Sequence, residues 1–321
     1  MSSNPKIFLL GPTASGKTEL TKFCYDNFQL ELVNVDSAQI YKGFNIGSAK
    51  PSAMDLKKYP HHLIDIIEPD TSYSVSHFRK DVDSIYKNAE VMNRTPFLTG
   101  GTMMYFHSLE FPLDNIPPTT PKIRLKVEKE LLQLGLPSMY EKLVKFDSIA
   151  AKSIHATDKQ RILRAIEVFY ESGKPISSYY QKNKDNELPL YPLLKLGLYP
   201  EDRSTLHNAI EERVEKMLRD GLVNEVKGIL KRYPNLSDSF SSLRSVGYKQ
   251  TYLYLKGELS YEELNNLKVL SQGAALRFLL TRVFDALNKV EGAIVKIKDP
   301  MEYLKRLEFH KNAKNHEDYF F

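Results

Sequence analysis

Gly11-Pro12-Thr13-Ala14-Ser15-Gly16-Lys17-Thr18 is the stretch that decides the fold, because it matches the phosphate-loop pattern G-x-x-x-x-G-K-[ST]. It lies between a short apolar run, Ile7 to Leu10, and a helical pattern from Gly16 to about Phe28. Glycines allow several amide groups of such a loop to converge on one phosphate, and the positive end of the following helix strengthens the site. The predicted phosphate ligands are Gly11, Thr13, Ala14, Ser15, Gly16, Lys17 and Thr18, with Lys17 as a mobile charge and the Thr18 hydroxyl holding Mg²⁺.

The loop alone does not identify the reaction. An ATP-binding kinase, a nucleoside triphosphatase and a transferase that releases diphosphate could all use this nucleotide-binding motif. No signature of a pocket for a nucleotide base stands out elsewhere in the sequence.

Two further apolar runs end in residues typical of a ligand site. Glu31 to Val35 ends at Asp36, and Pro96 to Thr99 ends at Gly100-Gly101 before a helix through Tyr105 and Leu109. Strands that alternate with helices predict a mainly parallel sheet, and ligands bind such sheets at the carboxyl ends of the strands. We therefore expect an α/β fold, a parallel sheet flanked by helices like that of P-loop nucleoside triphosphatases.

The composition changes at Phe111 to Pro121, where four prolines interrupt the chain. Helical, charge-rich sequence follows to about Gly173, and a strand-like run returns at Pro192 to Tyr199. Long amphipathic helices are expected after it, including one at Tyr261 to Leu287. The predicted division is a discontinuous core, residues 1–115 and 192–300, a helical insertion, residues 116–191, and a charged tail, residues 301–321.

Bulk properties exclude several classes of protein. The 321 residues are 42% hydrophobic and 26% charged, with a net charge of +5, so a sizeable core is expected and a polyanionic partner is permitted but not required. No apolar run approaches about 20 residues, and the start lacks the features of a signal peptide, so we expect a cytoplasmic protein without a membrane segment. The one cysteine, Cys24, is expected to be a buried structural thiol. Nothing requires more than a monomer.

Asp36 allows three roles: indirect Mg²⁺ binding, general base, or cap of the following turn. Gln39 could pair bidentately with an adenine edge, whereas Ser37 could only cap. Thr102 could hydrogen-bond a phosphate or an attacking group, or could cap the next helix. His61 and His62 lack metal-ligand spacing, so we expect structural or capping roles for both.

Taken together, the sequence resembles the tRNA dimethylallyltransferase family, also called tRNA isopentenyltransferases, from Lys6 to about Val290. Besides the phosphate loop, the resemblance depends on an ordered set of motifs: Val35-Asp36-Ser37-Ala38-Gln39-Ile40-Tyr41-Lys42-Gly43, Ile46-Gly47-Ser48-Ala49-Lys50-Pro51, Pro60-His61-His62-Leu63-Ile64-Asp65, Gly100-Gly101-Thr102-Met103-Met104-Tyr105-Phe106 and Arg244-Ser245-Val246-Gly247-Tyr248-Lys249.

The resemblance implies a concrete reaction. The exocyclic amine of the adenine at tRNA position 37, beside the anticodon, would attack dimethylallyl diphosphate and release diphosphate. Asp36 matches the family's general base, Thr102 stands with it in the catalytic set, and Arg213 matches an arginine that contacts the diphosphate. Taken alone, Arg213 would be read as a solvated helix charge.

The resemblance also implies contacts with the anticodon stem-loop of tRNA, whose adenine must be turned out of its stack. The implied tRNA-binding residues are Asp36, Ser37, Ala38, Gln39, Thr102, Arg124, Gln160, Arg161, Ile162, Leu163, Arg164, Arg244, Ser245, Val246, Gly247, Tyr248, Lys249 and Arg277. As isolated charges, the cations in this set would be read as solvated surface.

One departure from the family pattern concerns the last long helix. Where members commonly carry a basic stretch, this chain has Gln272-Gly273-Ala274-Ala275-Leu276-Arg277-Phe278-Leu279, followed by Thr281-Arg282. Losing two or three phosphate contacts should weaken RNA affinity and flatten its salt dependence. Two alternatives stay open: an isopentenyltransferase acting on free adenine nucleotides, and a P-loop kinase or triphosphatase that binds RNA without prenylating it.

Overall fold

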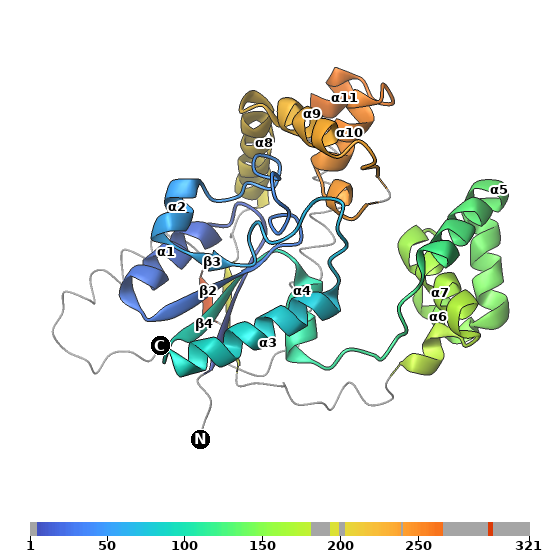
Figure 1. The fold of residues 1–321 in the computed structure, drawn as a ribbon, viewed down its shortest axis with the longest axis horizontal. Coiled ribbons are helices and arrows are strands. Elements are labelled where there is room, and N and C mark those ends of the chain that lie inside the picture. The colour runs from blue at the N-terminus through green and yellow to red at the C-terminus, as the bar shows by residue number, and fades with distance from the viewer. Residues whose placement is uncertain (1–4, 181–192, 199–202, 239, 266–294, 298–321) are drawn as a thin grey trace. The chain divides into compact units, whose positions relative to one another are not determined.

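The computed structural model of the chain describes residues 5–180, 193–198, 203–238, 240–265 and 295–297 (Figure 1). The chain divides into two compact units, one formed by Met1–Glu110 with Pro189–Phe321 and the other by Phe111–Leu188. The second unit begins and ends within a few residues of the helical insertion predicted at 116–191. The predicted tail, 301–321, and most of the predicted helix at 261–287 lie outside the described residues.

A six-stranded sheet organises the first unit, and every neighbouring pair of its strands is parallel, in the order β3-β2-β4-β1-β5-β6. Its strands are β1 (Lys6–Leu10), β2 (Leu30–Val35), β3 (His61–His62), β4 (Thr95–Gly100), β5 (Leu193–Leu198) and β6 (Val295–Ile297). The predicted parallel α/β fold is therefore confirmed. The sequence did not predict β3 and β6, because strands of two or three residues are too short to show a periodic pattern.

Both faces of the sheet are covered, which explains why its strands read as continuous apolar runs. On one face, Val33, Val35 and Leu98 pack against α3 (Val75–Val91) and α4 (Met103–Glu110). On the other face, residues of alternate register, such as Leu32 and Phe97, pack against Leu20 of α1 (Lys17–Asn27). Cys24 lies half-buried in this second layer, and burial raises the pKa of its thiol to about 11, so the thiol is protonated at neutral pH.

A separate apolar cluster joins the segment after β2 to the later helices of the first unit. Ile40, Tyr41 and Phe44 pack with residues of α9 (Leu222–Arg232) and α10 (Tyr248–Leu255). The remaining elements of this unit are α2 (Ala53–Lys58), α8 (Arg203–Arg219), the short 3₁₀ helix η3 (Ser242–Arg244) and α11 (Tyr261–Asn265). The loop that follows Asp36 thus packs against residues that lie about 200 positions later in the chain.

The second unit is helical, as the sequence predicts, and has its own core. It contains α5 (Pro121–Phe146), α6 (Ser148–Ser153), α7 (Lys159–Ser172) and the 3₁₀ helix η1 (Ile176–Tyr179). α5 is interrupted at Gly135, whose φ of 74° departs from helical geometry two residues before Pro137. Val127, Leu143, Ile162 and Ile166 are fully buried between these helices.

Candidate active site

The phosphate loop, residues 11–18, connects β1 to α1, as its motif predicts. A side chain at Gly11 would bring a Cβ within 2.7 Å of Ser15 Oγ and 2.9 Å of the Leu198 carbonyl oxygen, so only glycine fits there. Ala14 and Gly16 both have positive φ, 63° and 86°. No side chain caps the start of α1, so the positive end of the helix opens onto the loop.

Lys17 turns back onto the loop that carries it. Its ammonium donates to the carbonyl oxygens of Gly11, at 2.8 Å, and Pro12, at 2.6 Å. Burial and, to a lesser extent, the nearby Arg213 lower the pKa of Lys17 to about 8, and Asp36 opposes part of this shift. The loop also contains a buried hydroxyl oxygen, Ser15 Oγ, that has no hydrogen-bond partner among the described residues. A donor left unpaired beside a half-buried cation suits an anionic ligand.

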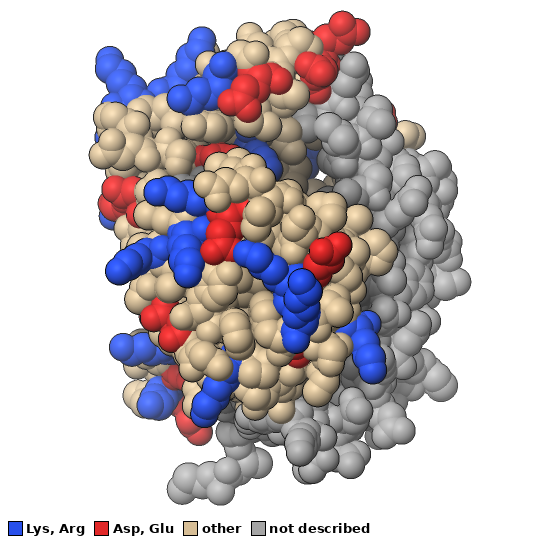
Figure 2. Space-filling model, turned by 90° about the vertical axis from the view of Figure 1, so that its right-hand side faces the viewer, with Lys and Arg blue, Asp and Glu red and all other residues tan. Residues whose placement is uncertain are grey.

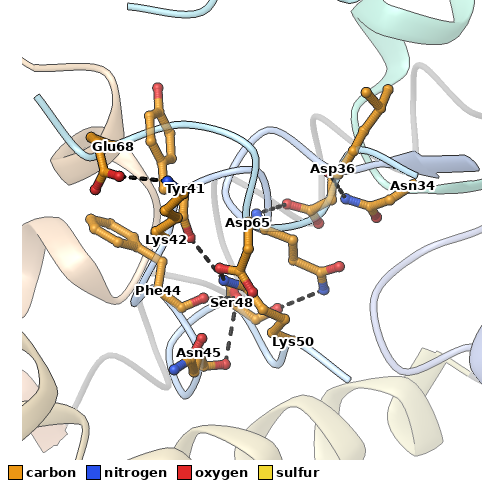
Figure 3. Close-up of polar contacts among 12 residues, drawn as sticks. Asn34, Asp36, Tyr41, Lys42, Phe44, Asn45, Ser48, Lys50, Asp65 and Glu68 are labelled. Atoms are coloured by element: carbon orange, nitrogen blue, oxygen red, sulfur yellow. Dashed lines mark hydrogen bonds and ion pairs between the residues drawn. The ribbon is translucent and has the colours of Figure 1, made fainter. Parts of the chain in front are cut away.

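Asp36 follows β2 directly and uses its two carboxylate oxygens differently (Figure 3). Oδ1 accepts hydrogen bonds from the amides of Ala38, at 2.8 Å, and Gln39, at 3.3 Å, so it caps the next turn. The described part of the chain offers Oδ2 no hydrogen bond. The capping role and a chemical role, which the sequence left as alternatives, are therefore compatible, because each needs only one oxygen.

The ends of β2 and β4 are joined by close contacts. A Cβ on Gly100 would lie 2.1 Å from the Val35 carbonyl oxygen, so glycine is required at this crossing. The Thr102 amide donates to that same oxygen at 3.0 Å, and Thr102 Oγ1 accepts from the Ser37 amide at 3.0 Å. The Thr102 hydroxyl therefore binds the Asp36–Ser37 turn and makes no hydrogen bond to the amides of α4 in the described chain.

Arg213, on α8, lies in the pocket with the phosphate loop rather than in solvent. Burial lowers the pKa of its guanidinium, and the nearby Asp36 carboxylate raises it. Lys17, Arg213 and Asp36 line a single pocket, which places two cations and one carboxylate around the same space. The interpretation of Arg213 as a solvated helix charge is thus wrong.

Several residues of this pocket were not predicted. Asn34 and Thr99 interrupt otherwise apolar strands and occupy paired positions on β2 and β4. A polar residue within a buried apolar run was the signal that could have identified them. The others in this group are Thr21, Lys22, Ala49, Pro51, Asp55, Tyr59 and His61.

The two histidines have different surroundings. His61 Nδ1 lies 2.7 Å from the Tyr59 carbonyl oxygen, and burial lowers the pKa of its imidazole. A carbonyl only accepts, so Nδ1 carries the proton and Nε2 is an acceptor. His62 Nε2 instead lies 2.5 Å from the Glu31 carboxylate. Both contacts agree with structural roles.

The fit of this site to Mg²⁺ depends on its oxygen atoms. Thr18 is exposed at the start of α1, and no cluster of three or more His, Cys, Asp or Glu side chains suited to a metal occurs among the described residues. Mg²⁺ usually keeps several waters and binds through one or two protein oxygens together with substrate phosphates. The exposed Thr18 hydroxyl beside the loop fits that pattern.

The segment Arg244–Lys249 is only partly available to a partner. Arg244 and Lys249 are exposed, and Val246 is 55% exposed, but Tyr248 is fully buried against Phe44. The Tyr248 hydroxyl donates to Glu225 Oε1 at 2.7 Å. This burial therefore contradicts a direct RNA contact by the Tyr248 side chain. The sequence did not reveal this, because a residue that packs in the core and one that binds RNA look alike within a half-apolar motif.

In the second unit, the predicted tRNA-binding residues separate into three groups. Arg124, Gln160 and Arg161 are exposed. Arg164 donates to Thr119 Oγ1 and to the Pro117 carbonyl oxygen, both at 3.0 Å, so it holds the segment before α5. Ile162 is a fully buried core residue, which excludes a side-chain contact with RNA, and Leu163 is half-buried.

The remaining predictions concern the last long helix, the surface charge and the absence of a membrane segment. Arg277 and the altered stretch 272–282 lie outside the described residues. Figure 2 shows Lys and Arg side chains interspersed with Asp and Glu over the described part of one face. None of the described helices combines the length and apolar character that crossing a membrane requires.

A glycine loop between a strand and a helix lines one pocket together with a lysine, an arginine and a carboxylate. This arrangement defines a P-loop α/β protein built for a phosphorylated substrate. Comparison with known proteins narrows this class. The model of the IPP transferase family matches residues 39–272. A tRNA dimethylallyltransferase of Nitrosococcus oceani is 44% identical over 80% of this chain and 81% of its own, and one of Methylobacillus flagellatus is 40% identical over 92% of each chain.

Solved structures with a similar fold are consistent with this family. The tRNA isopentenylpyrophosphate transferase of Bacillus halodurans is 29% identical, with a TM-score of 0.64 over 97% of this chain and 96% of its own. A eukaryotic dimethylallyltransferase acting on tRNA shares the fold at 22% identity, with a TM-score of 0.74 over 96% of this chain and 78% of its own. The chain belongs to the IPP transferase family.

Proposed function

We propose that this protein is a tRNA dimethylallyltransferase. It transfers the dimethylallyl group of dimethylallyl diphosphate to the exocyclic amine of the adenine at tRNA position 37, beside the anticodon, and releases diphosphate. The observation that supports this most directly is that Lys17 and Asp36 line one pocket in a chain of this family.

Asp36 acts as general base. The lone pair of an adenine amine is delocalised into the ring, so the amine is a weak nucleophile until it loses a proton. As the nitrogen bonds to the first carbon of the dimethylallyl group, Asp36 Oδ2 accepts that proton. Oδ1 remains bound to the amides of Ala38 and Gln39, which fixes the direction in which Oδ2 points.

The phosphate loop stabilises the leaving group. When the bond between carbon and diphosphate oxygen breaks, negative charge collects on the diphosphate. Lys17, Arg213 and the amides at the start of α1 are already arranged around the pocket, so they stabilise this charge without a large reorganisation. The Ser15 hydroxyl, which has no partner in the described chain, can donate a hydrogen bond to the bound diphosphate.

The Thr18 hydroxyl would hold Mg²⁺, with the diphosphate oxygens and water as its other ligands. When bound, the ion neutralises part of the charge on the leaving group. Thr102 contributes by positioning: its hydroxyl holds the Ser37 amide, and with it the turn that carries Asp36.

The tRNA is bound mainly by exposed groups. On the first unit these are Ser37, Arg244 and Lys249, and on the second they are Arg124, Gln160 and Arg161. A further contact at Arg277 is part of the proposal.

The deciding experiment is incubation of the full chain with dimethylallyl diphosphate, Mg²⁺ and unmodified tRNA, followed by mass analysis of the nucleosides. We expect one adenosine per tRNA to gain a dimethylallyl group, only when all components are present. Parallel reactions contain AMP, ADP or ATP in place of tRNA, and ATP with tRNA but no prenyl donor. Prenylated free nucleotide, or ATP hydrolysis without prenylation, would replace the proposal with one of the two alternatives.

A further inference from the structure

The loop that follows Asp36, residues 36–50, contacts residues 61–67 through a dense set of polar contacts (Figure 3). The Asp65 amide donates to the Gln39 carbonyl oxygen at 3.1 Å, and the Lys42 amide donates to the Ile67 carbonyl oxygen at 2.9 Å. Tyr41 and Ile67 also form an isolated parallel bridge. The two segments therefore behave as one structural element beside the pocket.

This element contains unusual backbone geometry. Ala49, Leu63 and Asp65 have positive φ values of 48°, 63° and 54°, although none is glycine. Such residues persist only when their surroundings hold them, and they concentrate at functional sites. Asp65 forms an ion pair with Lys50, Ala49 directly precedes Lys50, and Leu63 lies two residues before Asp65.

Lys50 is the centre of the arrangement. Its side chain is 3% exposed, and its ammonium donates to Asp65 Oδ1 at 2.5 Å and to the Tyr41 carbonyl oxygen at 2.8 Å. One cation thus joins Tyr41 of the loop 36–50 to Asp65 of the segment 61–67. A buried ammonium needs such partners, because losing them would leave an unpaired charge.

The two residues before Lys50 hold the side chain of Gln39. Gln39 Nε2 donates to the carbonyl oxygens of Ser48, at 3.0 Å, and Ala49, at 3.4 Å, directly before Lys50. Only the amino end of the amide can face two carbonyls, so Oε1 is directed the other way. Gln39 lines the pocket with Asp36, and there it can accept but not donate. The bidentate pairing with adenine, which needs the amino group, does not fit this geometry.

We infer that Lys50 and Asp65 are positioning residues for the transfer reaction: they hold Ser48 and Ala49 against Gln39, so that Gln39 presents an acceptor oxygen to the exocyclic amine of the substrate. This inference rests on the proposed function. An amine at the acceptor position satisfies that oxygen, whereas an oxo group faces it with a second acceptor. The pair therefore contributes to selection of adenine over a 6-oxopurine.

The test compares Lys50→Met and Asp65→Asn with the wild-type protein. Asp65→Asn suits the left-handed backbone at that position, because Asn tolerates it. In both variants we expect kcat to fall about 10²-fold, since small misplacements near the reacting groups have effects of this size. Affinity for dimethylallyl diphosphate, measured by titration calorimetry, should stay within about twofold, because the phosphate loop is not touched.

A matched control exists in the same loop. Lys42 and Glu68 form an ion pair at 2.6 Å, but their side chains are 49% and 43% exposed. Lys42→Met removes a cation of the same type from the same loop without removing a buried contact. It should leave kcat within about twofold, because exposed ion pairs contribute little. A loss equal to that of Lys50→Met would overturn the inference.

The double variant Lys50→Met/Asp65→Asn separates positioning from folding. It removes the buried ammonium that Asp65→Asn leaves unpaired, so its thermal unfolding midpoint should recover relative to the Asp65→Asn protein. Its kcat should remain low, because Gln39 is still not held. Recovery of both quantities would show that the pair serves stability alone.

A selectivity measurement completes the test. Anticodon stem-loops with adenosine or inosine at the acceptor position compete for binding, and wild type should prefer adenosine, by about tenfold from one hydrogen bond. Lys50→Met should reduce this preference. An unchanged preference with unchanged kcat overturns the inference, whereas a wild-type protein that prenylates no tRNA overturns the proposed function instead.

Discussion

The two sides of the pocket are stabilised in different ways. The phosphate loop, residues 11–18, is held by near neighbours: Lys17 donates to Gly11 and Pro12, and the Ser15 amide donates to Pro12. The carboxylate loop, residues 36–50, is held by distant ones, among them Thr102, Asp65 and Glu225. A short local motif can therefore specify the phosphate loop, to which Arg213 adds a distant cation, whereas the carboxylate loop depends on contacts with several distant segments of the first unit.

This contrast predicts that substitutions in the two loops separate binding from chemistry. Asp36→Asn should have the largest effect, a fall in kcat of about 10²–10⁴-fold, because it removes the proton acceptor. Asparagine keeps an oxygen that can accept from Ala38 and Gln39, so the turn should survive. Steady-state kinetics and calorimetric titration with dimethylallyl diphosphate measure the two quantities. Equal loss of turnover and diphosphate binding would mean that Asp36 is structural.

On the other side of the pocket, Lys17→Met should weaken binding of dimethylallyl diphosphate by about 10²-fold, because a buried charge-assisted contact is lost. Lys22→Met is a suitable control, since Lys22 lines the same pocket but pairs with Asp55 at 2.8 Å. Its diphosphate affinity should change by less than about threefold. A similar loss in both variants would indicate general electrostatics rather than a specific ligand.

A pH series sharpens the same comparison. Lys17 binds diphosphate in its charged form, and its pKa is lowered to about 8, mainly by burial. Bound diphosphate favours the charged form and raises that pKa. Above about pH 7, where the terminal phosphate is fully ionised, affinity should be constant up to about pH 8 and fall up to about tenfold per unit beyond it. Arginine stays charged throughout, so the Lys17→Arg protein should lack this decline if it binds at all.

The smallest expected effect concerns the distant support of the carboxylate loop. Glu225 accepts hydrogen bonds from the amides of Asn45 and Ile46, at 3.1 and 2.8 Å, and from the Tyr248 hydroxyl. Tyr248→Phe removes the last of these and should lower the free energy of unfolding by about 1 kcal/mol. Urea denaturation measures this change, and kcat should stay within about twofold. A large fall in kcat would instead mean that this hydrogen bond, acting through Glu225, helps to set the position of the carboxylate loop.

How much the sequence could predict follows the same division. The phosphate loop, the β2 and β4 ends and the parallel sheet were predictable because each depends on residues close together in the chain. Asn34 and His61 were missed as pocket residues because their placement depends on strand pairing. Tyr248 and Ile162 were assigned to tRNA although both are core residues, because motif membership does not distinguish a contact from its support.

The crossing of β2 and β4 has a consequence for motion. The amides of Ser37 and Thr102 each donate across it, one to Thr102 Oγ1 and the other to the Val35 carbonyl oxygen. Each amide hydrogen is protected from exchange with solvent deuterium while its hydrogen bond across the crossing is intact. The catalytic carboxylate and its threonine neighbour should thus open and close as one cooperative unit, with matching exchange rates at both amides.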